Sequence, residues 1–114
     1  MMKKISETVR RIFFLVPKMP NYVQIETTNV CNLNCKMCPR KNLGVSLKHM
    51  DIGLFDKIIG KLEKVNVINL TGWGEPLSNP DFFGIVKSVK KRNKKVGFTT
   101  NGTLLNNDMI DEIY

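Results

Sequence analysis

Residues 22–38 read Tyr-Val-Gln-Ile-Glu-Thr-Thr-Asn-Val-Cys-Asn-Leu-Asn-Cys-Lys-Met-Cys. The alternation of apolar and polar side chains at the start of this stretch predicts a β-strand over 22–27. Cys31, Cys35 and Cys38 follow, and they are the only cysteines of the 114-residue chain. Three thiolates on one loop can hold a metal centre and leave one position open, which is typical of catalytic metal sites. An iron–sulfur cluster normally takes four cysteines, so three would leave one iron free.

Two more strand–helix units are predicted after this loop. The pattern predicts strands over 66–71 and 95–100, with helices over 51–64, over 80–92 and from 107 onward. Asp51 and Asn106 are expected to cap the first and third helices, and Asn79 to cap the second, with Pro80 at its first position. Alternating strands and helices predict an α/β fold with a parallel sheet and right-handed crossovers.

The three predicted strands are amphipathic, whereas parallel strands buried on both faces usually read as continuous apolar runs. The apolar positions, expected to meet the helices, are Val23, Ile25, Ile68, Leu70, Val96 and Phe98. The polar positions are Gln24, Glu26, Asn69, Thr71, Thr99 and Asn101. We hypothesise that the polar face is the inner wall of an open barrel that holds cofactor and substrate; the alternative is a face that is simply solvated.

The spacing Cys31-x-x-x-Cys35-x-x-Cys38, within the wider stretch 26–40, resembles the signature of the radical S-adenosylmethionine (radical SAM) superfamily, and is closest to its SPASM-associated branch. The resemblance runs from about Pro20 to Tyr114. It implies that 20–114 form a core domain of three βα units, the first half of a partial (β/α)6 TIM-like barrel. The sequence would then stop after the third unit, as an N-terminal fragment of that domain.

The resemblance also implies specific roles for residues on the three loops. Cys31, Cys35 and Cys38 would hold a [4Fe–4S] cluster, whose fourth iron binds the methionine moiety of SAM. The segment 72–76 resembles the family's GGEP motif, with Trp73 in place of a glycine, and 99–102 resembles its TNG segment. The expected cofactor-binding residues are Met37, Gly72, Trp73, Gly74, Glu75, Pro76 and Asn101.

A member of this family would cleave SAM reductively to a 5′-deoxyadenosyl radical, which takes hydrogen from a substrate. It would need an electron donor such as flavodoxin or ferredoxin, and its substrate would be a peptide or a small molecule. The residues also allow two alternatives. One is a non-catalytic SAM- or cluster-binding remnant, and the other is a small zinc module that uses the three cysteines and His49, the only histidine.

Segment 1–19 is predicted to form a short amphipathic helix, over 5–16, and a linker. The helix would place apolar residues on one face at Ile5, Val9, Ile12, Phe13 and Val16. The chain has 18 Lys and Arg against 10 Asp and Glu, a net charge of +8, but aromatic residues do not interleave with the basic runs, so nucleic-acid stacking is not indicated. The odd cysteine number and the lack of a membrane-length apolar run predict a reducing, cytoplasmic location.

Overall fold

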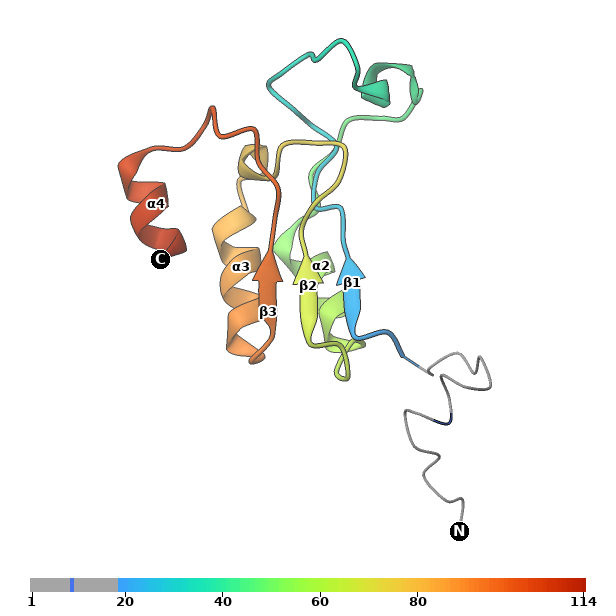
Figure 1. Ribbon diagram of the computed structural model, residues 1–114, viewed down its shortest axis with the longest axis vertical. Coiled ribbons are helices and arrows are strands. Elements are labelled where there is room, and N and C mark those ends of the chain that lie inside the picture. Colours follow the sequence, from blue (N-terminus) through green and yellow to red (C-terminus); the bar gives the residue numbers. More distant parts are fainter. Residues whose placement is uncertain (1–8, 10–18) are drawn as a thin grey trace.

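The computed structural model describes residues 19–114 together with Val9. Its sheet consists of β1 (Tyr22–Gln24), β2 (Val67–Asn69) and β3 (Lys95–Gly97), in the order β1-β2-β3, and both strand pairs are parallel (Figure 1). The register aligns the apolar residues Val23, Ile68 and Val96 in one row across the sheet. The predicted α/β fold with a parallel sheet is therefore confirmed.

The strands are shorter than the sequence pattern predicts, although the predicted positions are right. Backbone pairing continues for one residue beyond the strands, from Ile25 N to Asn69 O and from Leu70 N to Gly97 O, each at 2.8 Å. Past this point side chains replace carbonyls as partners, since Thr99 N donates to Thr71 Oγ1 at 3.0 Å. The regular ladder ends where the loops begin.

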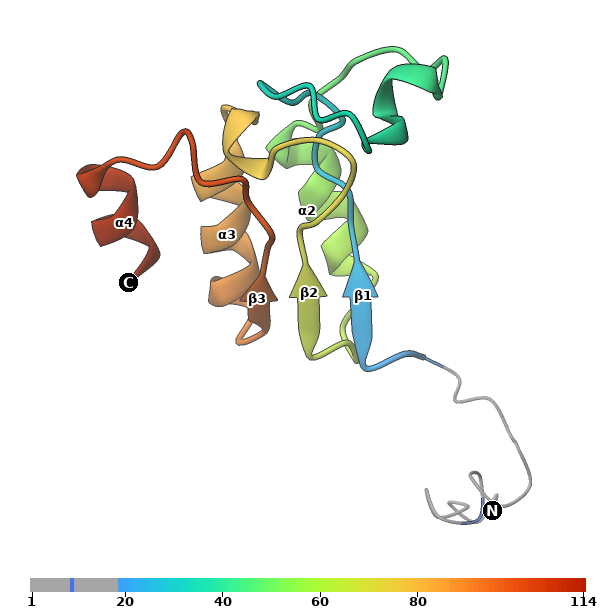
Figure 2. The same ribbon diagram turned by 45° about the horizontal axis from the view of Figure 1, so that its top comes forward.

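Helices α2 (Ile52–Gly60) and α3 (Phe82–Lys91) cover the same face of the sheet (Figures 1 and 2). The core between the helices and the sheet comprises Ile25, Phe55, Ile59, Val65, Ile68, Leu70, Leu77, Phe82, Ile85, Val86 and Val89. On the opposite face Gln24, Glu26 and Thr99 are exposed, and no described element covers them. The amphipathic alternation is confirmed; the inner-wall hypothesis stays a prediction.

Two of the three predicted helix caps form as expected. Asp51 Oδ1 accepts a hydrogen bond from Leu54 N at 2.9 Å, and Asn106 Oδ1 accepts one from Met109 N at 2.9 Å. Asn106 begins α4 (Asn107–Ile113), which stands beside α3 rather than over the sheet (Figure 1). Ile110, on this helix, is consequently 40% exposed.

The second cap was predicted at the wrong residue. Helix α3 begins at Phe82 after Asp81, two residues later than expected, because the Asn79 side chain is used elsewhere. Its Nδ2 donates to Thr27 O at 2.8 Å and to Met50 O at 3.0 Å, and its Oδ1 accepts from Asp81 N at 2.9 Å. Asn79, only 3% exposed, thus joins the two ends of the cysteine loop.

Helix α2 ends at Gly60, four residues before the predicted end. The reason lies on the segment before β3, where Lys94 Nζ donates to Leu62 O at 2.9 Å, Glu63 O at 3.0 Å and Val65 O at 2.6 Å. These carbonyls turn toward one ammonium group instead of continuing a helix. A long-range contact therefore overrides a local helical pattern.

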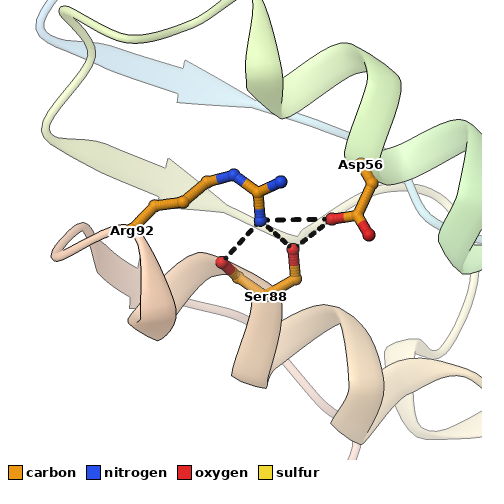
Figure 3. Close-up of polar contacts among 3 residues, drawn as sticks. All are labelled: Asp56, Ser88 and Arg92. Carbon is orange, nitrogen blue, oxygen red and sulfur yellow. Dashed lines mark hydrogen bonds and ion pairs between the residues drawn. The ribbon is translucent and has the colours of Figure 1, made fainter.

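A polar cluster joins α2 to α3 at Asp56, Ser88 and Arg92 (Figure 3). Arg92 Nη1 lies 3.2 Å from Asp56 Oδ1 and donates to Ser88 Oγ at 2.5 Å and to Ser88 O at 3.0 Å. Ser88 Oγ also donates to Asp56 Oδ1. Arg92 Nη1, Ser88 Oγ and Asp56 Oδ1 thus bond one another, and the cluster connects the two helices.

The predicted helix over 5–16 and the boundary between segments 1–19 and 20–114 concern residues that, Val9 and Met19 apart, lie outside the described part of the chain. They stay predictions. Within the described residues, no helix has the length and apolar character needed to cross a membrane.

Asn79 joins the two ends of the cysteine loop, and this role, which we call the Asn79 clamp, can be tested by removing its side chain. Asn79→Ala removes two donors from buried carbonyls and one acceptor from Asp81 N, so we expect the free energy of unfolding to fall by about 2–4 kcal/mol. Asn107→Ala, at the exposed first residue of α4, should change it by less than about 0.5 kcal/mol. Urea unfolding followed by circular dichroism measures both, and similar values for the two variants would contradict the clamp.

Candidate cofactor site

The loops that follow β1, β2 and β3 meet at the carboxyl edge of the sheet, where sites of α/β proteins usually form (Figure 1). An open cavity of about 270 Å³ lies among them. All three loops contribute to its lining, which consists of Cys31, Leu33, Cys35, Thr71, Gly72, Gly74, Glu75, Thr99, Thr100 and Asn101.

Gly74 lets the loop after β2 pack directly on the start of the cysteine loop. A Cβ atom at this position would lie 2.3 Å from Thr28 O and 2.6 Å from Val30 O, both backbone atoms that cannot turn away. The neighbouring Glu75 N donates to Val30 O at 2.8 Å. Only glycine allows this approach, so the first and second loops are held in contact by the absence of a side chain.

Glu75 joins the second loop to the third. Its carboxylate is 2% exposed and accepts from Leu77 N at 3.1 Å and Thr100 Oγ1 at 2.6 Å through Oε1, and from Asn101 N at 2.7 Å through Oε2. A buried carboxylate is tolerated only when donors replace its water shell. The short helix η2 (Pro76–Ser78) begins directly after it and uses the same carboxylate as its cap.

Glu26, on the polar face of the sheet, contacts the second loop on the side that faces the sheet. Its Oε1 accepts a hydrogen bond from Trp73 N at 2.5 Å. A Cβ atom on Gly72 would lie 2.3 Å from Glu26 Cγ, so the loop passes close over this side chain. Glu26 therefore shapes the floor of the loop that carries Gly72 and Gly74.

The cysteine loop is closed at its base by paired side chains. Thr28 Oγ1 lies 2.8 Å from His49 Nδ1, and Asn29 accepts from Lys48 N at 2.6 Å and donates to Ser46 O at 2.9 Å. His49 is therefore engaged at the base of the loop, and within the described residues it forms no group with the cysteines that could hold a metal ion. The structure gives the zinc-module alternative no support.

The thiols themselves are accessible: Cys35 is exposed, whereas Cys31 and Cys38 are half-buried. Cys38 N donates to Cys35 O at 3.1 Å, so these two residues share one turn before η1 (Pro39–Asn42). Among the described residues no three His, Cys, Asp or Glu side chains are arranged to hold one metal ion. The donor set nevertheless fits an iron–sulfur cluster, since thiolate sulfur suits iron and two of the three cysteines, Cys31 and Cys35, line one cavity.

The structure brings together most, but not all, of the residues that the sequence singles out. Lining the cavity are Cys31, Cys35, Gly72, Gly74, Glu75 and Asn101. Cys38 is not among the lining residues, Met37 is 94% exposed, Trp73 is 51% exposed and Pro76 is buried. The roles of all of these in cofactor binding stay predictions.

Sequence reasoning missed two polar residues at this edge, Asn32 and Thr103. Asn32 Nδ2 donates to Thr103 Oγ1 at 2.8 Å, and both side chains bond the Asn101 amide. These residues come from loops about 70 positions apart in the chain. The one available signal was that both follow strands predicted to end at the same edge.

Comparison with known proteins identifies relatives of this chain. A family model described as the Radical SAM superfamily matches residues 25–114. The tungsten-containing aldehyde ferredoxin oxidoreductase cofactor-modifying protein of Pyrococcus furiosus is 40% identical over 95 residues, which are 81% of this chain and 27% of that protein. The GTP 3′,8-cyclase of Alkaliphilus metalliredigens is 33% identical over 93 residues, 75% of this chain and 28% of that enzyme. The chain thus spans under a third of these relatives' length.

A solved structure shares the fold. The crystal structure of BtrN in complex with AdoMet and 2-DOIA matches with a TM-score of 0.72 at 20% sequence identity, over 86% of this chain and 42% of BtrN. BtrN in an open conformation matches with a TM-score of 0.71. This likeness confirms the predicted architecture, strand–helix units of a TIM-like barrel.

The packing of Gly74 yields a first prediction for the site. Gly74→Ala forces a methyl group against two carbonyl oxygens, and we expect a loss of about 1–3 kcal/mol in the free energy of unfolding. Gly60→Ala, at the exposed end of α2 with no atom within 4 Å of its Cβ, should instead stabilise the protein by about 0.5–1 kcal/mol. The contact between loops would be disproved if both substitutions stabilised the protein.

The bracing role of Glu75 yields a second. Glu75→Gln turns one acceptor oxygen into an NH2 group, so either Leu77 N, which bonds Oε1, or Asn101 N, which bonds Oε2, loses its acceptor and stability falls by about 1–3 kcal/mol. Backbone amide exchange at Leu77 or at Asn101 should accelerate, as NMR can measure. Glu63→Gln, at an exposed position, is the matched control and should leave both exchange rates unchanged. Unchanged exchange at both amides in Glu75→Gln would refute the role of the Glu75 carboxylate.

Proposed function

The chain belongs to the radical SAM superfamily, whose members bind a [4Fe–4S] cluster and SAM, and from this premise we propose that it supplies the cofactor-holding part of a radical SAM enzyme. The observation that carries the proposal is the shared cavity at the carboxyl edge. Cys31 and Cys35 line it from the first loop, Gly72, Gly74 and Glu75 from the second, and Asn101 from the third.

We propose that Cys31, Cys35 and Cys38 ligate the cluster. Segment 27–50, which contains them, carries Lys36, Arg40, Lys41 and Lys48 but no Asp or Glu. These positive charges would offset the negative charge that three metal-bound thiolates bring to one loop. Ligation requires Cys38 to turn toward the cavity that the other two cysteines line.

The second loop is suited to holding SAM. Gly72 and Gly74 leave the backbone open to close approach by a ligand. The Glu75 carboxylate has about four acceptor positions, of which three are used by protein donors, so one remains for the ammonium group of SAM. Met37, Trp73, Pro76 and Asn101 complete the proposed cofactor contacts.

When bound, the two cofactors would supply reductive cleavage of SAM to a 5′-deoxyadenosyl radical, which would take hydrogen from a substrate. The chain's own contribution is to hold both cofactors at one edge of a rigid sheet. An electron donor such as flavodoxin or ferredoxin is the proposed partner. A reducing cytoplasmic setting suits the three free thiols.

Anaerobic reconstitution with iron and sulfide tests cofactor binding. We expect a brown protein with absorbance near about 400 nm, and loss of that absorbance in Cys35→Ala. His49→Ala is the control, because His49 contacts Thr28 at the loop base and should not be needed for the cluster. A colourless protein that retains zinc, and loses it in His49→Ala, would overturn the proposal in favour of a zinc module.

Catalysis is tested separately from binding. The reconstituted chain, given SAM and dithionite, should release 5′-deoxyadenosine, detected by liquid chromatography and mass spectrometry. Cys35→Ala should release none. A chain that holds the cluster and binds SAM yet forms no 5′-deoxyadenosine would be a non-catalytic binding protein.

A further inference from the structure

Asn101 lies at the centre of a closed set of side-chain hydrogen bonds between the first and third loops. Its Nδ2 donates to Asn32 Oδ1 at 3.1 Å, and its Oδ1 accepts from Thr103 Oγ1 at 2.7 Å. Asn32 Nδ2 donates to Thr103 Oγ1 at 2.8 Å and closes the ring. The three side chains therefore fix one another's orientation.

The direction of the Asn101 amide follows from these partners. Its oxygen accepts two hydrogen bonds from Thr103, one from Oγ1 and one from the backbone N at 2.9 Å. Since an NH2 group could accept neither, the oxygen must face Thr103. The NH2 group then faces the first loop, where it lies 3.9 Å from Cys31 Sγ in hydrogen-bond geometry.

Cys31 differs from the other two cysteines in its donors. Its sulfur accepts from Leu33 N at 3.4 Å as well as from Asn101 Nδ2. Within residues 19–114, no donor to the sulfur of Cys35 or Cys38 is found. The sulfur of Cys31, a predicted cluster ligand, thus accepts from two N–H groups, one of them on a residue 70 positions away in the sequence.

A tight turn alone does not explain this arrangement. The bond from Thr103 N to Asn101 Oδ1 is an Asx turn, which uses only the side-chain oxygen. Aspartate or serine could make the same turn. The NH2 group is the part of Asn101 that the turn does not need, and it is the part directed at Cys31 and Asn32.

We propose that Asn101 is a positioning residue that acts through Cys31: its amide donates to the Cys31 sulfur and raises the reduction potential of the cluster held there. This inference rests on the proposed function. Hydrogen bonds to cluster sulfurs are among the factors that set the potential. A donor stabilises the reduced cluster, which carries one more negative charge, more than the oxidised one.

The test is a redox titration of the reconstituted chain, followed by electron paramagnetic resonance. Asn101→Ser keeps a side-chain oxygen for the turn but removes the NH2 group. Its cluster should have a lower potential than that of the wild type, so that at the wild-type midpoint the oxidised form exceeds the reduced form several-fold. Asn32→Ser breaks the same ring but leaves the Asn101 donor in place, and its potential should stay near the wild type.

The possible outcomes distinguish failure of the Asn101 inference from failure of the proposed function. Equal potentials in the wild type and Asn101→Ser, or equal shifts in Asn101→Ser and Asn32→Ser, would overturn the inference and leave the proposed function intact. Failure of the wild-type chain to form a cluster would overturn both. If Asn101→Ser does not fold, Asn101→Asp is used instead, because it keeps the Oδ1 acceptor and replaces the donor with a negative charge. The reduction potential of its cluster should be lower than that of the wild type. An unchanged or raised potential would overturn the inference.

Discussion

The site depends on one residue, Glu75, because it contacts all three loops at the carboxyl edge. Its backbone N–H donates to Val30 O on the first loop, and its buried carboxylate accepts from Thr100 and Asn101 on the third. No cation pairs with it among the described residues, so its three hydrogen bonds alone offset the loss of hydration. Such a group tolerates few alternative arrangements, which makes the relative placement of the loops specific.

The hydrophobic core and the candidate site lie in different parts of the fold. Helices α2 and α3 bury the apolar face of the sheet and thereby align the strand ends. The cysteine loop extends past this core. It is held at its base by Thr28, Asn29 and Asn79, at Val30 by Glu75 of the second loop, and at Cys31 and Asn32 by Asn101 of the third loop. Cys35 is exposed on this loop, where few packing contacts would oppose the rearrangement that the proposed cluster binding would require.

Features set by local chemistry were predictable from sequence, and those set by distant partners were not. The caps at Asp51 and Asn106 and the alternation of the strands depend on a few neighbouring residues. The predicted start of α3 was wrong because the Asn79 side chain donates to Thr27 O and Met50 O instead of capping the helix. The predicted end of α2 was wrong because Lys94 Nζ donates to carbonyls of the segment that follows α2. The contact between Asn32 and Thr103 was not predicted for the same reason, because sequence periodicity does not indicate which loops about 70 residues apart will meet.

Three cysteines would leave one iron of a four-iron cluster without a protein ligand and open to SAM. Mössbauer spectroscopy of the chain reconstituted with ⁵⁷Fe, before and after addition of SAM, can detect this iron. We expect SAM to change the isomer shift of one of the four irons, because only that iron would lack a cysteine ligand and gain nitrogen and oxygen donors. A spectrum in which SAM leaves all four irons unchanged would contradict the proposed ligation.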